Sequence, residues 1–91
     1  MKKITYFYLT DCPYCKQADR AIEELKAEHL PYRSIEIERI NENEQPDIVA
    51  KYDYHAVPCM WIGNDKIYEG RLFESYEECK KMVQKTFEAA L

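Results

Sequence analysis

Two cysteines stand where a strand-like segment gives way to a helix-like one. Residues 3–9 alternate as a strand does, residues 15–30 carry apolar side chains at helical spacing, and the motif Cys12-Pro13-Tyr14-Cys15 joins them. Two such cysteines in a first helical turn can close a small disulfide ring, and the leading sulfur faces backbone N–H groups that lack helical partners. The placement favours the thiolate form of Cys12 and predicts a thiol-disulfide redox site. Asp11 either opposes the thiolate through its charge or caps the helix.

Length and charge limit what the chain can be. Its 91 residues, 46% of them hydrophobic, suit one domain spanning residues 1–91. A net charge of -4 without a block of Lys or Arg predicts no binding to nucleic acid or to an anionic membrane. The first residues show neither a long apolar stretch nor a small-residue cleavage site, so we expect no signal peptide, no membrane span and a cytoplasmic location. We also expect a monomer.

The four cysteines leave two structural alternatives. A disulfide scaffold is typical of secreted chains with small cores, whereas the 46% hydrophobic content of this chain supports a core without disulfide bonds. A zinc site would need a second ligand pair with complementary spacing, which Cys59, Cys79 and the two histidines do not form. We therefore expect no metal and no bound cofactor.

The first half of the chain predicts a strand, a helix, a strand and a short helix. The first helix is expected from residue 12 to about residue 29, and Pro31 ends it. Residues 32–38 alternate as a second strand. Pro46 suits the first position of a second helix, which is expected to end before residue 56.

The second half predicts a hairpin and a last helix. Strand-like runs at residues 58–62 and 66–69 flank the turn-forming residues 63–65. Ser75 and Glu78 form a capping-box pattern at the start of the last helix. The order is βαβαββα, in which the first two strands are parallel and the hairpin is antiparallel. The expected fold is α/β, a four-stranded mixed sheet flanked by helices.

In this order of elements, two motifs carry a family resemblance. The motif Cys12-Pro13-Tyr14-Cys15 after the first strand and Ala56-Val57-Pro58 before the third resemble the glutaredoxin family of the thioredoxin-like superfamily, over essentially the whole chain. The resemblance implies that Cys12 attacks a disulfide and that Cys15 resolves the mixed disulfide. It also implies that the Val57–Pro58 peptide is cis and faces Cys12, which would leave the Val57 backbone free to pair, strand-like, with a substrate's backbone. Pro13 and Tyr14 of the motif are further candidates for substrate contact, Tyr14 through apolar and stacking contact in the groove.

The chain departs from the family pattern where glutathione would be recognised. Glutaredoxins commonly carry a basic residue two positions before the first cysteine, where this chain has Thr10, and a Gly-Gly followed by an acid after the fourth strand, where residues 68–75 keep one glycine. Arg71 could pair with a glutathione carboxylate, and Ser75 could accept the other end at the last helix's N-terminus. We expect a glutaredoxin-type reaction on protein or glutathione-mixed disulfides, with glutathione as co-substrate.

Two other functions stay open. A thioredoxin-like protein disulfide reductant recharged by a flavin reductase would tolerate the altered segments, although the first strand lacks a buried acid and Trp61 does not precede Cys12. An iron-sulfur scaffold built from Cys12 of two subunits and glutathione is disfavoured by the second thiol and the proline. Cys59 is either a small buried residue or a thiol near the redox pair, and Cys79 is expected in the core.

Overall fold

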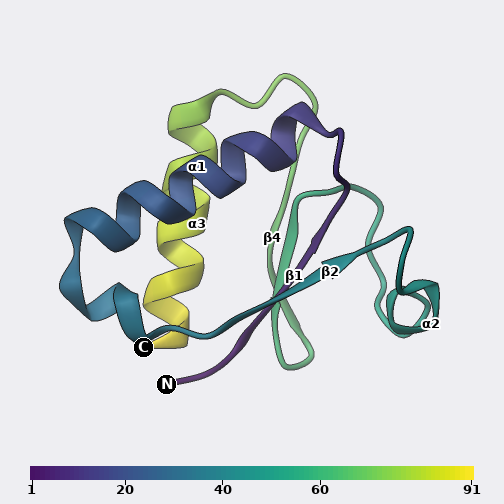
Figure 1. The fold of residues 1–91 in the computed structure, drawn as a ribbon, viewed down its shortest axis with the longest axis horizontal. Helices are drawn as coiled ribbons and strands as arrows, with labels where there is room; N and C mark the ends of the chain where they lie inside the picture. The colour runs from purple at the N-terminus through teal and green to yellow at the C-terminus, as the bar shows by residue number, and fades with distance from the viewer.

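One mixed sheet organises the molecule (Figure 1). The computed structural model describes residues 1–91, and its four strands lie in the order β2-β1-β3-β4. β1 pairs in parallel with β2 and antiparallel with β3, and β3 pairs antiparallel with β4. The elements are β1 (Ile4–Tyr8), α1 (Pro13–Glu28), a 3₁₀ helix (Leu30–Ser34), β2 (Ile37–Asn41), α2 (Pro46–Val49), β3 (Cys59–Ile62), β4 (Asp65–Glu69) and α3 (Tyr76–Ala90). The predicted order βαβαββα and the mixed sheet are confirmed.

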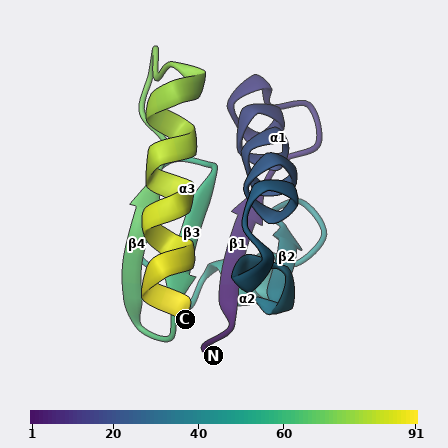
Figure 2. The same ribbon diagram turned by 90° about the vertical axis from the view of Figure 1, so that its left-hand side faces the viewer.

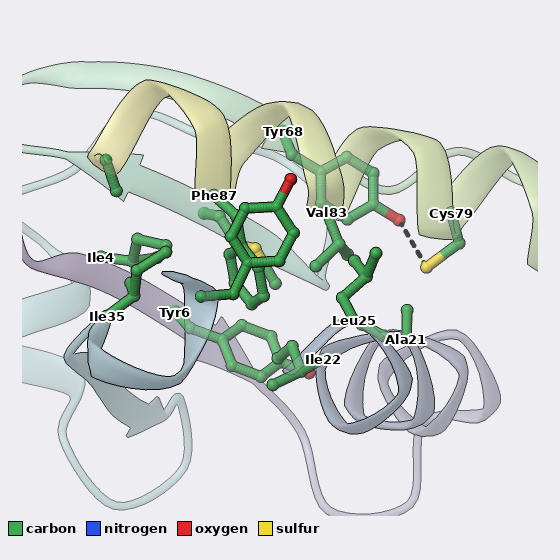
Figure 3. Close-up of a cluster of buried hydrophobic side chains, with 14 of the residues drawn as sticks. Ile4, Tyr6, Ala21, Ile22, Leu25, Ile35, Tyr68, Cys79, Val83 and Phe87 are labelled. Carbon is green, nitrogen blue, oxygen red and sulfur yellow. Dashed lines mark hydrogen bonds between the residues drawn. The ribbon is translucent and has the colours of Figure 1, made fainter. Parts of the chain in front are cut away.

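Each face of the sheet has its own apolar core. α1 and α3 lie side by side over one face (Figure 2), where Ile4 and Tyr6 of β1 join the larger core drawn in Figure 3. Phe7 points to the opposite face, because neighbouring residues of a strand alternate in direction. There Phe7 packs with Ile40, Cys59 and Trp61 beneath side chains from the segment around α2.

α1 begins at Pro13, one residue later than the sequence predicts. Proline suits the first helical position, where its missing N–H would have no helical acceptor. Cys12 is the N-cap residue, with φ -97° and ψ 115°, and its sulfur accepts the N–H of Cys15. The alternative in which Asp11 caps this helix is therefore wrong.

The second strand starts later than predicted. Residues 30–34 form a 3₁₀ helix, and β2 begins at Ile37 instead of residue 32. Tyr32 and Ile35 are the buried positions, three residues apart, which is 3₁₀ spacing rather than alternation. The Tyr32 ring packs against Phe87 at a centroid distance of 5.1 Å, and its hydroxyl donates to Glu88 Oε2 at 2.6 Å. These contacts with α3 draw the segment into the helical layer.

The other elements follow the sequence more closely. α2 starts at Pro46 as predicted but is a single turn that ends at Val49. The hairpin turns at Gly63, which adopts a φ of 58°, and the capping box of Ser75 and Glu78 opens α3. No helix of this chain has both the length and the apolar character to span a membrane.

Candidate redox site

The two motif cysteines lie together at the N-terminus of α1. The N–H of Cys15 donates to Cys12 Sγ at 3.3 Å, because the N-cap position turns the Cys12 side chain back over the first helical turn. Cys12 is partly exposed, whereas Cys15 is only 1% exposed. A substrate disulfide in solution can therefore reach the Cys12 sulfur, whereas Cys15 is buried behind Cys12.

The surroundings of Cys15 keep its thiol protonated. Burial raises the pKa of Cys15 well above the usual thiol range, and the hydrogen bond with Cys12 and the charge of Asp19 act in the same direction. The Tyr6 hydroxyl hydrogen-bonds to the Cys15 carbonyl (3.2 Å) and to Asp19 Oδ1 (3.1 Å), and Arg39 pairs with the same carboxylate at 2.7 Å. The backbone of Cys15 is thus fixed from β1.

The Val57–Pro58 peptide lies beside Cys12. The bond is cis, and Cys12 Sγ lies 4.0 Å from the Val57 carbonyl oxygen. The expectation of a cis peptide that faces Cys12 is confirmed. The N–H of Val57 donates to no group of the protein, so a backbone donor stands unpaired near the exposed thiol.

The end of β4 holds the loop that carries this peptide. Glu69 accepts the N–H groups of His55 and Ala56, and the N–H of Gly70 donates to the Pro58 carbonyl at 2.7 Å. A Cβ atom on Gly70 would lie 2.8 Å from Pro58 Cδ, so the close approach requires glycine at this position.

The sequence did not predict a role for Glu69, because no local pattern links this residue to residues 55 and 56. The only available signal was the hairpin. The turn pairs Ile62 with Asp65, and a register shift between Met60 and Trp61 then sets Glu69 across from Cys59, next to Pro58.

Tyr14 makes a contact that its sequence position did not predict. Its hydroxyl accepts the N–H of Phe73 at 2.8 Å, which joins the motif to the loop between β4 and α3. Figure 1 shows this loop at the same end of the molecule as the start of α1. Phe73 has a φ of 63°, a left-handed conformation that is unfavourable for a bulky side chain.

Arg71 and Ser75, the two residues proposed to pair with the ends of glutathione, lie in the segment between β4 and α3. Ser75 Oγ accepts the N–H of Glu78 at 3.1 Å, and the N–H of Ser75 donates to Glu78 Oε1 at 3.0 Å, so its polar groups are engaged in capping α3. Arg71 is exposed and forms no ion pair. Thr10 accepts from Asn41 Nδ2 at 3.0 Å and lines a hollow of about 280 Å³ that also borders Cys12. A larger hollow, of about 450 Å³, lies between α1 and α3, away from the thiols.

The other two cysteines are buried. Cys59 belongs to the smaller core, on the face opposite α1, and burial raises its pKa to about 12. Cys79 is fully buried in the larger core, where the Tyr68 hydroxyl hydrogen-bonds to its sulfur at 3.3 Å (Figure 3). Both environments favour an apolar packing role over thiol chemistry.

Known proteins share both the sequence pattern and the fold. The family model described as Glutaredoxin matches residues 4–67, a range that contains the motif and the cis peptide but ends before residues 68–75. A thioredoxin from Methanocaldococcus jannaschii is 37% identical over 68 residues, which are 75% of this chain and 78% of that protein. Thioredoxin 1 from Thermosipho africanus TCF52B has the same fold, with a TM-score of 0.59 at 24% identity over 96% of each chain. The chain therefore belongs to the glutaredoxin family and is a redox protein of the glutaredoxin and thioredoxin type.

Proposed function

We propose that the protein is a dithiol oxidoreductase that reduces disulfides of proteins, including mixed disulfides with glutathione. The observation that carries this proposal is the arrangement at Cys12. Its partly exposed sulfur accepts the N–H of Cys15, lies 4.0 Å from the Val57 carbonyl and has a second thiol directly behind it. No bound cofactor is required for this chemistry.

The reaction proceeds by two thiol-disulfide exchanges. The Cys12 thiolate attacks one sulfur of the substrate disulfide, and the other substrate sulfur leaves as a thiolate that takes up a proton. Cys15 then loses its proton and attacks Cys12 Sγ, which releases the second substrate thiol. The substrate gains two electrons, and the protein is left with a Cys12–Cys15 disulfide.

The different surroundings of the two thiols support this order of attack. The N-cap position directs the N–H of Cys15 at Cys12 Sγ, and this sulfur is the exposed one of the pair. Burial raises the pKa of Cys15 and keeps it protonated until a mixed disulfide has formed next to it. Cys15 therefore acts second. A pair that must return to the dithiol state suits a reducing compartment such as the cytoplasm, and the chain needs no second copy for these steps.

Two electron donors are candidates for the return step. Glutathione is favoured by the match to the glutaredoxin family. A flavin-dependent thioredoxin reductase is favoured by the thioredoxin relative and by the 68–75 segment, where Ser75 is engaged in capping α3. With glutathione, Arg71 is the cation that would pair with a carboxylate of the tripeptide.

To distinguish these donors, the oxidised protein is added to two parallel assays in which NADPH consumption is followed. One contains glutathione and glutathione reductase, and the other contains thioredoxin reductase. Turnover in either assay supports the proposed function and identifies the donor. If chemically reduced protein fails to reduce any disulfide, the proposed function is wrong regardless of the donor.

A further inference from the structure

One carboxylate ties the loop before Pro58 to the end of β4. Glu69 Oε2 accepts the N–H groups of His55 and Ala56, the latter at 2.7 Å, and Oε1 accepts Lys66 Nζ at 2.8 Å. Hydrogen bonds to an ionised acceptor are about twice as strong as neutral ones. Burial acts to raise the pKa of Glu69, but the bonds from Lys66 and the two N–H groups outweigh it and lower the pKa to about 2. The carboxylate is therefore charged at neutral pH.

The residue after Glu69 holds the other side of the same loop. The N–H of Gly70 donates to the Pro58 carbonyl at 2.7 Å, and its Cα lies so close that a Cβ atom would touch Pro58 Cδ at 2.8 Å. Glu69 and Gly70 together fix the backbone before and after Val57.

Val57 itself is left unpaired between these two anchors. Its N–H has no acceptor in the protein, and its carbonyl oxygen has one long contact, the 4.0 Å approach of Cys12 Sγ. Of the three consecutive N–H groups of residues 55–57, Glu69 occupies the first two and leaves the third free. A fixed and unpaired N–H and C=O beside a reactive sulfur are what an extended peptide needs in order to add as a short strand.

We infer that Glu69 is a positioning residue for peptide substrates, which holds the Val57 backbone ready to pair with the chain around a substrate cysteine. This inference rests on the proposed function, in which the backbone of a peptide substrate pairs with Val57, and adds to it the residue that positions that backbone. A small disulfide without peptide groups reacts with the same Cys12 but cannot use the Val57 backbone. Its reaction is therefore independent of Glu69.

The test is a ratio of two rate constants measured with pre-reduced protein and no recycling system. One is the second-order rate constant for a disulfide-linked peptide pair, and the other is that for bis(2-hydroxyethyl) disulfide. In Glu69→Ala the ratio should fall about tenfold, because the loop loses two hydrogen bonds that hold Val57 in place. Glu69→Gln keeps an oxygen acceptor of the same reach, so its ratio should fall only about twofold to threefold. Lys66→Ala removes the ion pair but neither N–H contact, and is the matched control with an unchanged ratio.

The outcomes separate the inference from the proposed function. A merely structural role for Glu69 would slow both reactions alike and leave the ratio unchanged in every variant, which would overturn the inference. If Glu69→Ala does not fold, an unchanged ratio in Glu69→Gln has the same meaning. If reduced wild-type protein reacts with neither disulfide, the proposed function itself fails.

Discussion

Gly70→Ala tests whether the end of β4 sets the position of the cis peptide. The added Cβ would lie 2.8 Å from Pro58 Cδ and 3.3 Å from the Val57 carbonyl oxygen. Carbon atoms in good contact are about 3.5 to 4.0 Å apart. The Pro58 ring is fully buried and cannot swing into solvent. The backbone around Val57 must therefore move away from β4, and its distance to Cys12 Sγ must change.

The expected effect on stability follows from overpacking. Extra atoms in a well-packed interior typically cost about 1 to 3 kcal/mol, and the 2.7 Å hydrogen bond from Gly70 to Pro58 is strained at the same time. We expect the free energy of unfolding to fall by about 2 kcal/mol. The rate with a peptide disulfide should fall about 10-fold to 100-fold, because misplacement by about 1 Å near the reacting atoms has effects of that size.

Gly63→Ala is the matched control for this variant. Gly63 has a φ of 58°, and a Cβ there would meet no atom within 4 Å. The left-handed backbone alone should cost about 1 to 2 kcal/mol, without any change in the peptide disulfide rate. Urea unfolding and single-turnover kinetics on both variants complete the comparison. Equal loss of activity in the two variants, or full activity in Gly70→Ala, would refute the reasoning.

Three other predictions concern Glu69 and the two buried cysteines, Cys59 and Cys79. The pKa of Glu69 in the folded protein is about 2, below its ordinary 4.5, so its carboxylate contributes stability above about pH 4.5 and this contribution is lost as the pH falls toward 2. Because the side chain is 22% exposed and solvent screens its charge, we expect this contribution to the free energy of unfolding to be about 1 to 2 kcal/mol. Over that pH interval, the free energy of unfolding measured in urea should therefore change less with pH in Glu69→Gln than in wild type. Cys59 has a pKa of about 12, so only about one molecule in ten thousand carries the Cys59 thiolate at pH 8. Mass spectrometry should therefore find Cys59 unalkylated by iodoacetamide until denaturant is added. Alkylation of Cys59 in the folded protein at the rate of Cys12 would contradict this. Cys79→Ala should lower the free energy of unfolding by about 1 to 2 kcal/mol with an unchanged peptide disulfide rate, and a slower reaction would show that Cys79 does more than pack.

The elements around the thiols could be predicted because their patterns are local. The β-forming residues of β1, the proline at the first position of α1 and the capping box of α3 each lie within a few residues, although β1 is buried on both faces and its burial does not alternate. The second strand could not be placed in this way, since Ile35 and Ile37 alternate as in a strand, whereas Tyr32 and Ile35 are spaced as in a 3₁₀ turn. Packing against α3 decides between them.

Only those parts of the site that belong to short sequence motifs could be predicted. The cysteine pair and Val57–Pro58 are recognisable in the sequence, whereas the contacts of Glu69 with residues 55 and 56 depend on the register of the hairpin. The N-cap of α1 shows the same limit. Asp11 is the better capping residue by type, but Pro13 fixes the start of the helix, and the cap therefore falls on Cys12.

The central claim is that Cys12 attacks and Cys15 resolves, and mass spectrometry of trapped intermediates tests it most directly. Wild type, Cys12→Ser and Cys15→Ser are each reduced, incubated with a disulfide-linked peptide pair, quenched in acid and mapped by proteolysis. We expect a stable mixed disulfide on Cys12 in Cys15→Ser, an internal Cys12–Cys15 disulfide in wild type and no adduct in Cys12→Ser. A mixed disulfide on Cys15 in Cys12→Ser that forms at the wild-type rate would contradict the account.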